Sequence, residues 1–333
     1  MNEIVLERAQ AGDGDAFQEL VEPHRRELVV HCYRILGSLE DAEDVTQEAL
    51  LAAWRGLANF DGRSLRAWFY RIATNRCLNH LRDGSRRPES HLLSMPTTVS
   101  EGLVSSDEPW WLEPFPDVLL DEVVPGPEAI YDARESIGLS FVAALQGLPA
   151  QQRAVLVLRD VLGFSAAESA AVLGVTATSV NSALIRARAG FRPGRSRDEV
   201  RLPTSAREVE VMERFVNAFQ SGDVQQVVAL LTEDAKLLMP PEPLECRGAY
   251  AIADFMQKMS FWGPGLALVP TRVNSQAAFG YYRNDPKTPI LRPGGLVVID
   301  VAGDRVCTIT RFGDRGFLAR LGLPRTLPAS EGR

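Results

Sequence analysis

The sequence has few cysteines, few histidines and no long apolar run. Its four Cys are widely scattered and its four His supply no matching ligand spacing, so we expect neither a disulfide framework nor a zinc site. No stretch of about 18 uncharged apolar residues occurs, which argues against a membrane-spanning helix. The first ten residues have no basic start followed by an apolar core, so we do not expect a secretory signal. These absences fit a cytoplasmic protein in a reducing environment.

The charges are unevenly distributed along the chain. A net charge of −7 would argue against a nucleic-acid partner if it were uniform, but residues 63–87 contain seven Arg and one Asp. Residues 186–201 contain six Arg, whereas residues 91–132 contain nine acidic side chains and no Lys or Arg. Two basic clusters separated by an acidic stretch indicate two phosphate-contacting surfaces, and solvated helix faces are the alternative.

Residues 84–132 are expected to be an extended linker. They contain seven prolines, which would break a helix or a central strand. Trp110, Trp111, Leu112 and Phe115 are unusual for a disordered tether, so part of this acidic segment is expected to pack against other residues.

The first two folded blocks are expected to be helical. Ser64 is expected to cap a helix over residues 65–81. Ser165 and Glu168 match a capping box that opens a short helix ending at Gly174, and Thr176 is expected to cap the next helix. Two short helices around a tight turn, the second one basic, predict a helix-turn-helix.

The third block has helical patterns first and strands afterwards. Ser205 and Glu208 match a capping box before the first helix. Beyond Gly265, β-branched and aromatic runs alternate with turn residues, which predicts antiparallel strands. Helices followed by a meander of strands indicate an α+β domain.

Several motifs resemble those of a known family. Residues 41–50 and 59–75 resemble domain 2 of the extracytoplasmic-function (ECF) sigma factors of the sigma-70 family, and residues 148–159 and 179–188 resemble their domain 4. The third block is similar to the SnoaL-like, NTF2-type cone fold through its helix-then-sheet order and its Phe-x-x-x-Phe-x-Ser-Gly-Asp start at Phe215.

The resemblance implies a multidomain chain with two all-α sigma domains and a C-terminal α+β NTF2-like cone domain. Helical domain 2 would occupy residues 3–83, the acidic Pro-rich linker residues 84–132, helix-turn-helix domain 4 residues 133–195 and the SnoaL-like domain residues 205–328. Such a chain would direct core RNA polymerase to promoters, recognise the −10 and −35 elements and help melt the DNA. The linker would thread the polymerase towards its active-site channel.

The resemblance also implies roles for particular residues. An acidic and amide face would dock on the β′ clamp helices of the polymerase: Asp41, Asp44, Gln47 and Glu48. The −10 element would be bound through arginines that contact phosphates and through Phe60, Ser64 and Asn75, which would hold an unpaired base. The full −10 set is Phe60, Arg63, Ser64, Arg66, Arg71, Asn75, Arg76, Asn79 and Arg82. For Phe60 the alternative is an ordinary core aromatic.

Domain 4 would contact the β flap of the polymerase and place its second helix in the major groove of the −35 element. Asn181 stands where many relatives have Arg, so the contact there would differ. The expected −35 residues are Thr176, Thr178, Ser179, Asn181, Ser182, Ile185, Arg186 and Arg188.

For the third domain we expect regulation rather than catalysis. It contains no His, and no carboxylate pair has a catalytic spacing, so no enzyme activity, cofactor or metal is expected. An unidentified small ligand and an anti-sigma partner remain open, and no membrane partner is expected. The candidate pocket residues are Tyr250, Asp254, Tyr281, Tyr282, Asp300 and Arg311.

Two other functions compete with a sigma factor: a stand-alone helix-turn-helix regulator with a ligand-sensing domain, and a SnoaL-like enzyme. The base-capture motif favours the sigma factor, because a duplex-binding regulator has no need to melt DNA.

Overall fold

The computed structural model describes residues 3–84, 103–105, 112–121, 136–191, 206–240, 244–258, 263–313 and 316–329. The chain divides into two compact units. The N-terminal unit consists of residues 1–87 and 118–194, and the C-terminal unit consists of residues 88–117 and 195–333.

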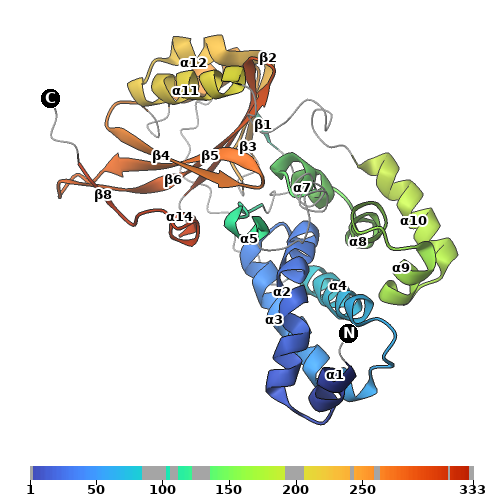
Figure 1. Ribbon diagram of the computed structural model, residues 1–333. Coiled ribbons are helices and arrows are strands. Elements are labelled where there is room, and N and C mark those ends of the chain that lie inside the picture. Colours follow the sequence, from blue (N-terminus) through green and yellow to red (C-terminus); the bar gives the residue numbers. More distant parts are fainter. Residues whose placement is uncertain are drawn as a thin grey trace. The chain divides into compact units, whose positions relative to one another are not determined.

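The first part of the N-terminal unit is helical (Figure 1), with elements α1 (Glu3–Gln10), α2 (Gly14–Leu36), α3 (Leu39–Gly56), η1 (Leu57–Asn59) and α4 (Leu65–Asp83). Helices α2, α3 and α4 begin at side-chain caps. The predicted cap of α4 is confirmed, because the Ser64 hydroxyl accepts a hydrogen bond from the Ala67 amide at 3.2 Å. Ser38 caps α3 in the same way through the Asp41 amide at 3.0 Å. Gly37 ends α2 with a φ of 77°, a conformation that favours glycine.

The second part contains α5 (Val118–Asp121), α7 (Leu139–Gln146), α8 (Ala150–Leu156), the π-helical turn η2 (Val157–Val161), α9 (Ala166–Leu173) and α10 (Ala177–Gly190). The predicted capping box at Ser165 and Glu168 is present, and α9 ends at Gly174 with a φ of 65°. Thr176 caps α10 through the Ser179 amide at 3.1 Å. The axes of α9 and α10 differ by 99°, within the range of about 90–120° found in helix-turn-helix motifs.

Among the described residues, no single helix is long and apolar enough to cross a membrane; α9 and α10 satisfy that test only as a bent pair.

The two helical parts of the N-terminal unit share buried contacts. Helix α4 packs against α9, and α2 packs against α7. The buried guanidinium of Arg34 in α2 donates to the Ser136 carbonyl at 3.2 Å and to the Ser136 hydroxyl at 2.6 Å. The buried Arg153 of α8 donates to the carbonyl of Ile35 at the end of α2. Because removing water from a charged group is costly unless it is hydrogen-bonded, these arginines tie the two parts together.

The C-terminal unit is a mixed sheet with helices. The helices are α11 (Ala206–Ser221), α12 (Val224–Leu230), α13 (Ala249–Lys258) and α14 (Phe317–Arg320). The strands are β1 (Leu103–Ser105), β2 (Leu231–Leu238), β3 (Leu244–Arg247), β4 (Leu266–Val273), β5 (Gln276–Asn284), β6 (Ile290–Ala302), β7 (Arg305–Gly313) and β8 (Leu327–Pro328). The strand order is β1-β3-β2-β7-β6-β5-β4, and β8 pairs with β6.

The predicted α+β class is confirmed, and so are the antiparallel strands expected beyond Gly265. Strands β4 to β7 form the predicted antiparallel meander. Strand β2, which the sequence reading did not find, follows α12 directly and pairs with β7 in parallel. Its Glu233 and Asp234 are the least buried part of the strand, so its polar centre hid the strand pattern. The predicted cap Ser205 lies outside the described residues.

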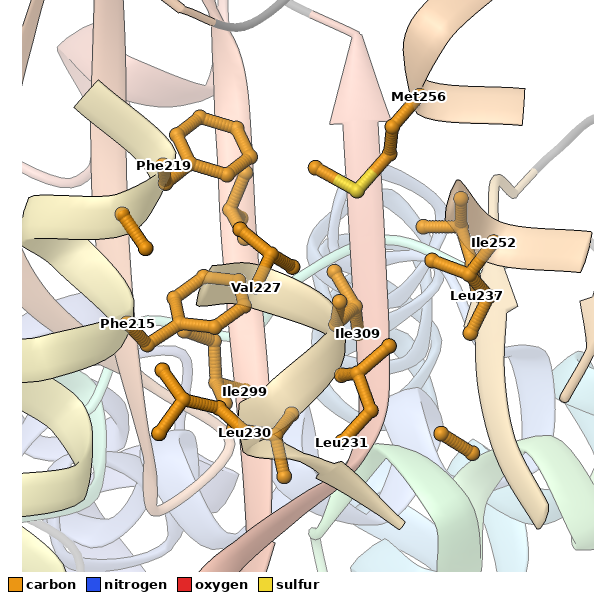
Figure 2. Packing of buried hydrophobic residues seen from close by; sticks show 14 of the residues in the cluster. Phe215, Phe219, Val227, Leu230, Leu231, Leu237, Ile252, Met256, Ile299 and Ile309 are labelled. Carbon is orange, nitrogen blue, oxygen red and sulfur yellow. The ribbon is translucent and has the colours of Figure 1, made fainter. Parts of the chain in front are cut away.

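The core of the C-terminal unit lies between the sheet and helices α11, α12 and α13 (Figure 2). Phe215 and Phe219 of α11 stack with ring centroids 5.8 Å apart. They share one apolar cluster with Val227 of α12 and with Ile299 and Ile309 of the sheet. The i, i+4 spacing of the two Phe residues puts both rings on one helix face, which explains why this helix packs flat on the sheet.

The described parts of residues 84–132 are more than a tether. Residues 103–105 form β1, which pairs antiparallel with β3. Leu112 and Phe115 are 4% and 1% exposed, so the expectation that part of this segment packs is confirmed. Trp110 and Trp111 lie outside the described residues.

Candidate nucleic-acid and polymerase interface

Helix α10 has one buried and one exposed face. Val180, Ala183 and Leu184 pack with Val155 and Ala170 in a small apolar cluster that holds the helix on its unit. The eight residues expected to read the −35 element all lie on the exposed side: Thr176, Thr178, Ser179, Asn181, Ser182, Ile185, Arg186 and Arg188. Ile185 is 70% exposed, and an apolar side chain in that position is suited to contact a thymine methyl group.

Arg188 is held in place by an acidic residue of the π-helical turn η2. Its Nε and Nη2 lie 2.9 and 2.7 Å from the two carboxylate oxygens of Asp160. The Arg188 side chain is 61% exposed. Solvent screens an exposed pair of this kind, so a DNA phosphate would compete with Asp160 on favourable terms.

The expected −10 residues gather on α4 and on the loop before it. The Arg63 side chain is 88% exposed, and Ser64 is used as the cap of α4. Phe60 is only 7% exposed and its ring lies 5.1 Å from that of Trp68, so in this conformation it is packed as a core aromatic. The remaining exposed members along α4 are Arg71, Arg76, Asn79 and Arg82.

A cavity of about 450 Å³ brings three of these residues together. It is lined by Val5, Glu19, Leu20, Pro23, His24, Arg63, Ser64, Leu65 and Arg66. This volume is within the range of about 300–1,000 Å³ typical of ligand pockets. Phe60 and Asn75 are not among the lining residues.

Arg66 is engaged by neighbours within the unit. Its Nε lies 3.3 Å from Glu27 Oε2, and its guanidinium carbon lies 4.9 Å above the Tyr70 ring. Burial alone would raise the pKa of Glu27, but a hydrogen bond from His24 and the charge of Arg66 bring that pKa below its ordinary value. Glu27 is therefore a stable anion that orients Arg66.

The side chain of Asn75 is hydrogen-bonded to helix α9 in this conformation. Its side-chain amide donates to the carbonyl of Val172 in α9 at 3.2 Å. Close by along α4, the ring of Tyr70 lies 5.5 Å from that of Phe164. The amide that was expected to hold an unpaired base is thus hydrogen-bonded to protein backbone.

The expected polymerase-binding residues lie along one face of α3. Asp44, Gln47 and Glu48 are exposed. Asp41 is half-buried and has an oxygen 3.4 Å from His80 Nε2 of α4. The opposite face carries the buried residues Leu39, Ala42, Val45, Thr46, Ala49, Leu50 and Ala53.

Sequence reasoning missed three buried polar residues of the N-terminal unit. Arg34 and Arg153 were counted only as ordinary charges, because a single Arg in a helical pattern resembles a surface residue. Burial lowers the pKa of Arg34 to about 10, so it remains charged at neutral pH. His31 is fully buried and its Nε2 lies 2.8 Å from the Thr74 hydroxyl. Burial, with smaller contributions from the charges of Arg34 and Arg66, lowers the pKa of His31 to about 3.

The candidate pocket residues of the C-terminal unit do not form one site, which corrects the sequence expectation. Tyr250 is 88% exposed and Asp254 pairs with Lys258 at 2.8 Å on the surface of α13. The Tyr282 hydroxyl donates to the Pro324 carbonyl at 2.7 Å. Asp300 accepts a hydrogen bond from Gln276, and its burial raises its pKa to about 6.

Tyr281 and Arg311 come together. Arg311 Nη2 donates to the Tyr281 hydroxyl at 2.6 Å. The Tyr281 ring lies directly over Gly294 and Gly295, where any Cβ would collide with it. The register of β5 and β6 shifts at this point, so a bulge opposite Tyr281 makes room for the ring.

Comparison with known proteins agrees with this architecture. Residues 20–87 match the family Sigma-70 region 2, residues 139–189 match Sigma-70, region 4, and residues 212–320 match the SnoaL-like domain. The crystal structure of the extracytoplasmic function sigma factor SigJ of Mycobacterium tuberculosis superposes with a TM-score of 0.61 at 22% identity, over 92% of this chain and 99% of SigJ. At that identity the similarity shows the fold.

Sequence relatives extend over the same regions. The ECF RNA polymerase sigma factor SigW of Bacillus subtilis is 29% identical over 190 residues, which are 56% of this chain and 92% of SigW. The ECF RNA polymerase sigma factor SigG of Mycobacterium tuberculosis is 41% identical over 327 residues, which are 96% of this chain and 87% of SigG. Since that match includes both helical regions and the C-terminal domain, this chain belongs to the ECF RNA polymerase sigma factors.

Proposed function

We propose that this chain binds core RNA polymerase and directs it to promoters, with α10 in the major groove of the −35 element and α4 with its preceding loop at the −10 element. The exposed face of α3 docks on the β′ clamp helices. A cytoplasmic location, where the polymerase and the DNA are found, is part of this proposal.

The single observation that carries the proposal is the division of α10 into two faces. Four apolar residues of the helix are buried, and all eight candidate readout residues are exposed. The Thr176 cap fixes where the helix begins, so the hydroxyls and the amide near its N-terminus have a defined direction towards base edges. Arg186 and Arg188 lie further along the helix, where they would contact phosphates.

The −10 assignment draws support from charge and from the cavity beside Arg63, Ser64 and Arg66. Five arginines of the region would contact the DNA backbone, so binding should weaken steeply with salt. The Asn75 amide is the proposed partner of an unpaired base. Because it donates to Val172 in this conformation, helices α4 and α9 must separate before Asn75 reaches DNA.

For the C-terminal domain we propose a regulatory role without catalysis. Its candidate acids and bases are dispersed: Asp300 faces Gln276, Tyr282 is tied to Pro324 and Tyr250 points outwards. A general acid and base must both reach one substrate, and the use of Asp300 and Tyr282 by these structural neighbours disfavours such a role.

The test is run-off transcription with the full-length chain and purified core polymerase. The chain should co-purify with core polymerase and support transcription from a cognate linear template. A pre-melted bubble template should restore transcription by variants that are defective in base capture. Reversing charge on α3 with Glu48→Arg should reduce core binding, whereas Glu7→Arg, an equal charge change on exposed α1, should not. Absence of core binding by the unaltered chain, or duplex operator binding without polymerase, would overturn the proposal.

A further inference from the structure

Residues 112–117, in the acidic segment between the two sigma domains, are folded into the C-terminal unit. Leu112, Phe115 and Asp117 are 4%, 1% and 7% exposed, and Pro114 and Pro116 are buried as well. A connecting loop normally runs over the surface, whereas this six-residue stretch is buried in the domain. Residues 112–117 are called the strap below.

The turn between β4 and β5 binds the strap. The backbone amide of Phe115 donates to the side-chain oxygen of Asn274 at 2.7 Å. The backbone amide of Asn274 in turn donates to the Phe115 carbonyl at 2.8 Å. Pro116 forms a β-bridge with Val273. Both backbone groups of Phe115 are therefore used by a single turn residue, which gives the docking a fixed register.

Asp117, the last residue of the strap, binds residues on both sides of Asn274 in the same turn region. Its Oδ1 accepts from the Ser275 amide at 2.7 Å, and its Oδ2 lies 3.2 Å from Arg272 Nε. A buried carboxylate needs such donors, because an unpaired buried charge is strongly unfavourable. Arg272 and Ser275 thus select an acidic residue at the end of a Phe-Pro-Asp sequence.

The receiving turn has an uncommon backbone conformation. Asn274 and Ser275 have φ angles of 53° and 60°, in the left-handed region that favours glycine. Two-residue hairpin turns of this kind are usually Asn-Gly or Gly-Gly. A serine at the second place, together with an Asn whose side chain is used by Phe115, indicates that this turn is built for binding as well as for reversing the chain.

A second anchor lies shortly before the strap. Strand β1 pairs with the edge strand β3 in antiparallel register, with Leu103 opposite Cys246 and Ser105 opposite Leu244. Addition of an extended segment to a sheet edge is a common mode of peptide binding. The same interdomain segment is therefore held at two places on one domain.

We propose that the C-terminal domain is a latch for the interdomain segment: the Asn274–Ser275 turn, with Arg272, binds residues 112–117 and must release them before the segment enters the polymerase. This inference rests on the proposed sigma-factor function, in which that segment threads towards the active-site channel. The latch couples the C-terminal domain to initiation without any catalytic step.

A reversible disulfide lock tests the latch. Pro116 and Val273 are a non-hydrogen-bonded antiparallel pair, because the hydrogen bonds of the bridge are made by their neighbours. Such pairs have Cα atoms about 4.5 Å apart, within the range of about 4.4–6.8 Å that a disulfide spans. The double variant Pro116→Cys with Val273→Cys should form the disulfide when oxidised, and the four native cysteines are buried.

The oxidised double variant should lose run-off transcription by about tenfold or more, because a covalent lock removes the released state, and reductant should restore it. The two single variants, treated with the same oxidant, are the controls. Transcription by the locked protein at the level of its reduced form would overturn the latch, as would failure of the disulfide to form. If the reduced and unaltered proteins also fail to transcribe and to bind core, the proposed sigma-factor function is at fault instead.

A matched pair of turn variants tests release in the opposite direction. Asn274→Gly keeps a residue suited to positive φ but removes the oxygen that accepts from Phe115, whereas Ser275→Gly relieves the same backbone conformation and keeps the amide that donates to Asp117. Hydrogen exchange at Phe115 in the full-length chain should accelerate in Asn274→Gly and remain slow in Ser275→Gly. Equal exchange in both variants would contradict the role assigned to the Asn274 side chain.

Discussion

Replacing His31 by Gln should remove a defined part of the acid sensitivity of the N-terminal unit. His31 is buried between α2 and α4, with its ring 4.8 Å from that of Tyr70. The Thr74 hydroxyl donates to the Tyr70 carbonyl at 2.6 Å, so it accepts a hydrogen bond from His31 Nε2–H. The glutamine amide is also a donor of suitable length, and it does not titrate.

The direction and size of the change in stability with pH follow from the pKa of His31. Burial lowers the pKa of His31 to about 3, against an ordinary value of 6.5. Between these two values the unfolded chain binds a proton that the folded chain does not, so stability is fully present above the unfolded pKa and falls as the pH drops below it. At pH 5, about 1.5 units below the unfolded pKa, the loss is about 2 kcal/mol, at 1.36 kcal/mol per unit.

The assay is urea unfolding followed by circular dichroism at pH 7.5 and at pH 5.0, for the wild type and for His31→Gln. The wild type should lose about 2 kcal/mol more than the variant between the two pH values. The difference between the proteins matters, because carboxylates titrate in both. An identical pH dependence in the two proteins would show that His31 is not kept neutral by burial.

Three further outcomes are expected. Asn75→Ala should weaken promoter opening, measured by permanganate reactivity, more than closed-complex binding, measured by gel shift; equal losses would exclude base capture. Thr176→Ala should destabilise the helix-turn-helix by about 1 kcal/mol through loss of the cap, measured by urea unfolding, whereas Thr176→Ser should be close to wild type, and no difference between the two would contradict the capping role. Burial raises the pKa of Asp300 to about 6, so the ionisation of Asp300 lowers the stability of the folded state as the pH rises from about 4 to 6. Asp300→Asn should therefore stabilise the C-terminal unit at pH 7.5 by up to about 3 kcal/mol and have little effect near pH 3.5. A gain in stability that persists at low pH would indicate another cause.

Local signals in the sequence predicted the helical regions well. Ser64, Ser165 and Thr176 were identified as caps, and each accepts the expected backbone hydrogen bond. Capping depends on residues within one turn of the helix, so the information is contained in a few consecutive positions. The apolar stripe of α10 is local in the same sense, because its spacing follows from the helical period.

Contacts between distant segments were beyond sequence reasoning. Nothing near Asn75 in the chain indicates that its amide donates to Val172, 97 positions later. The strand β2 was missed because its polar centre hides the strand pattern, and its parallel partner β7 is recognised only once the sheet is assembled. The pocket predicted for the C-terminal domain failed on Tyr250, since an aromatic residue at a helix start has no local mark of its 88% exposure.

The sequence by itself determined where the capped helices begin, the α+β order of the third domain and, through its motifs, the sigma-factor family. Those properties depend on neighbours along the chain, where periodicity and capping chemistry are read directly. Only the tertiary structure decided that Arg34 and Arg153 are buried ties between the helical parts and that Asp117 faces Arg272 and Ser275. The physical reason is that a buried charged side chain needs hydrogen-bond partners, and the fold supplies these partners from segments that lie far away in the sequence.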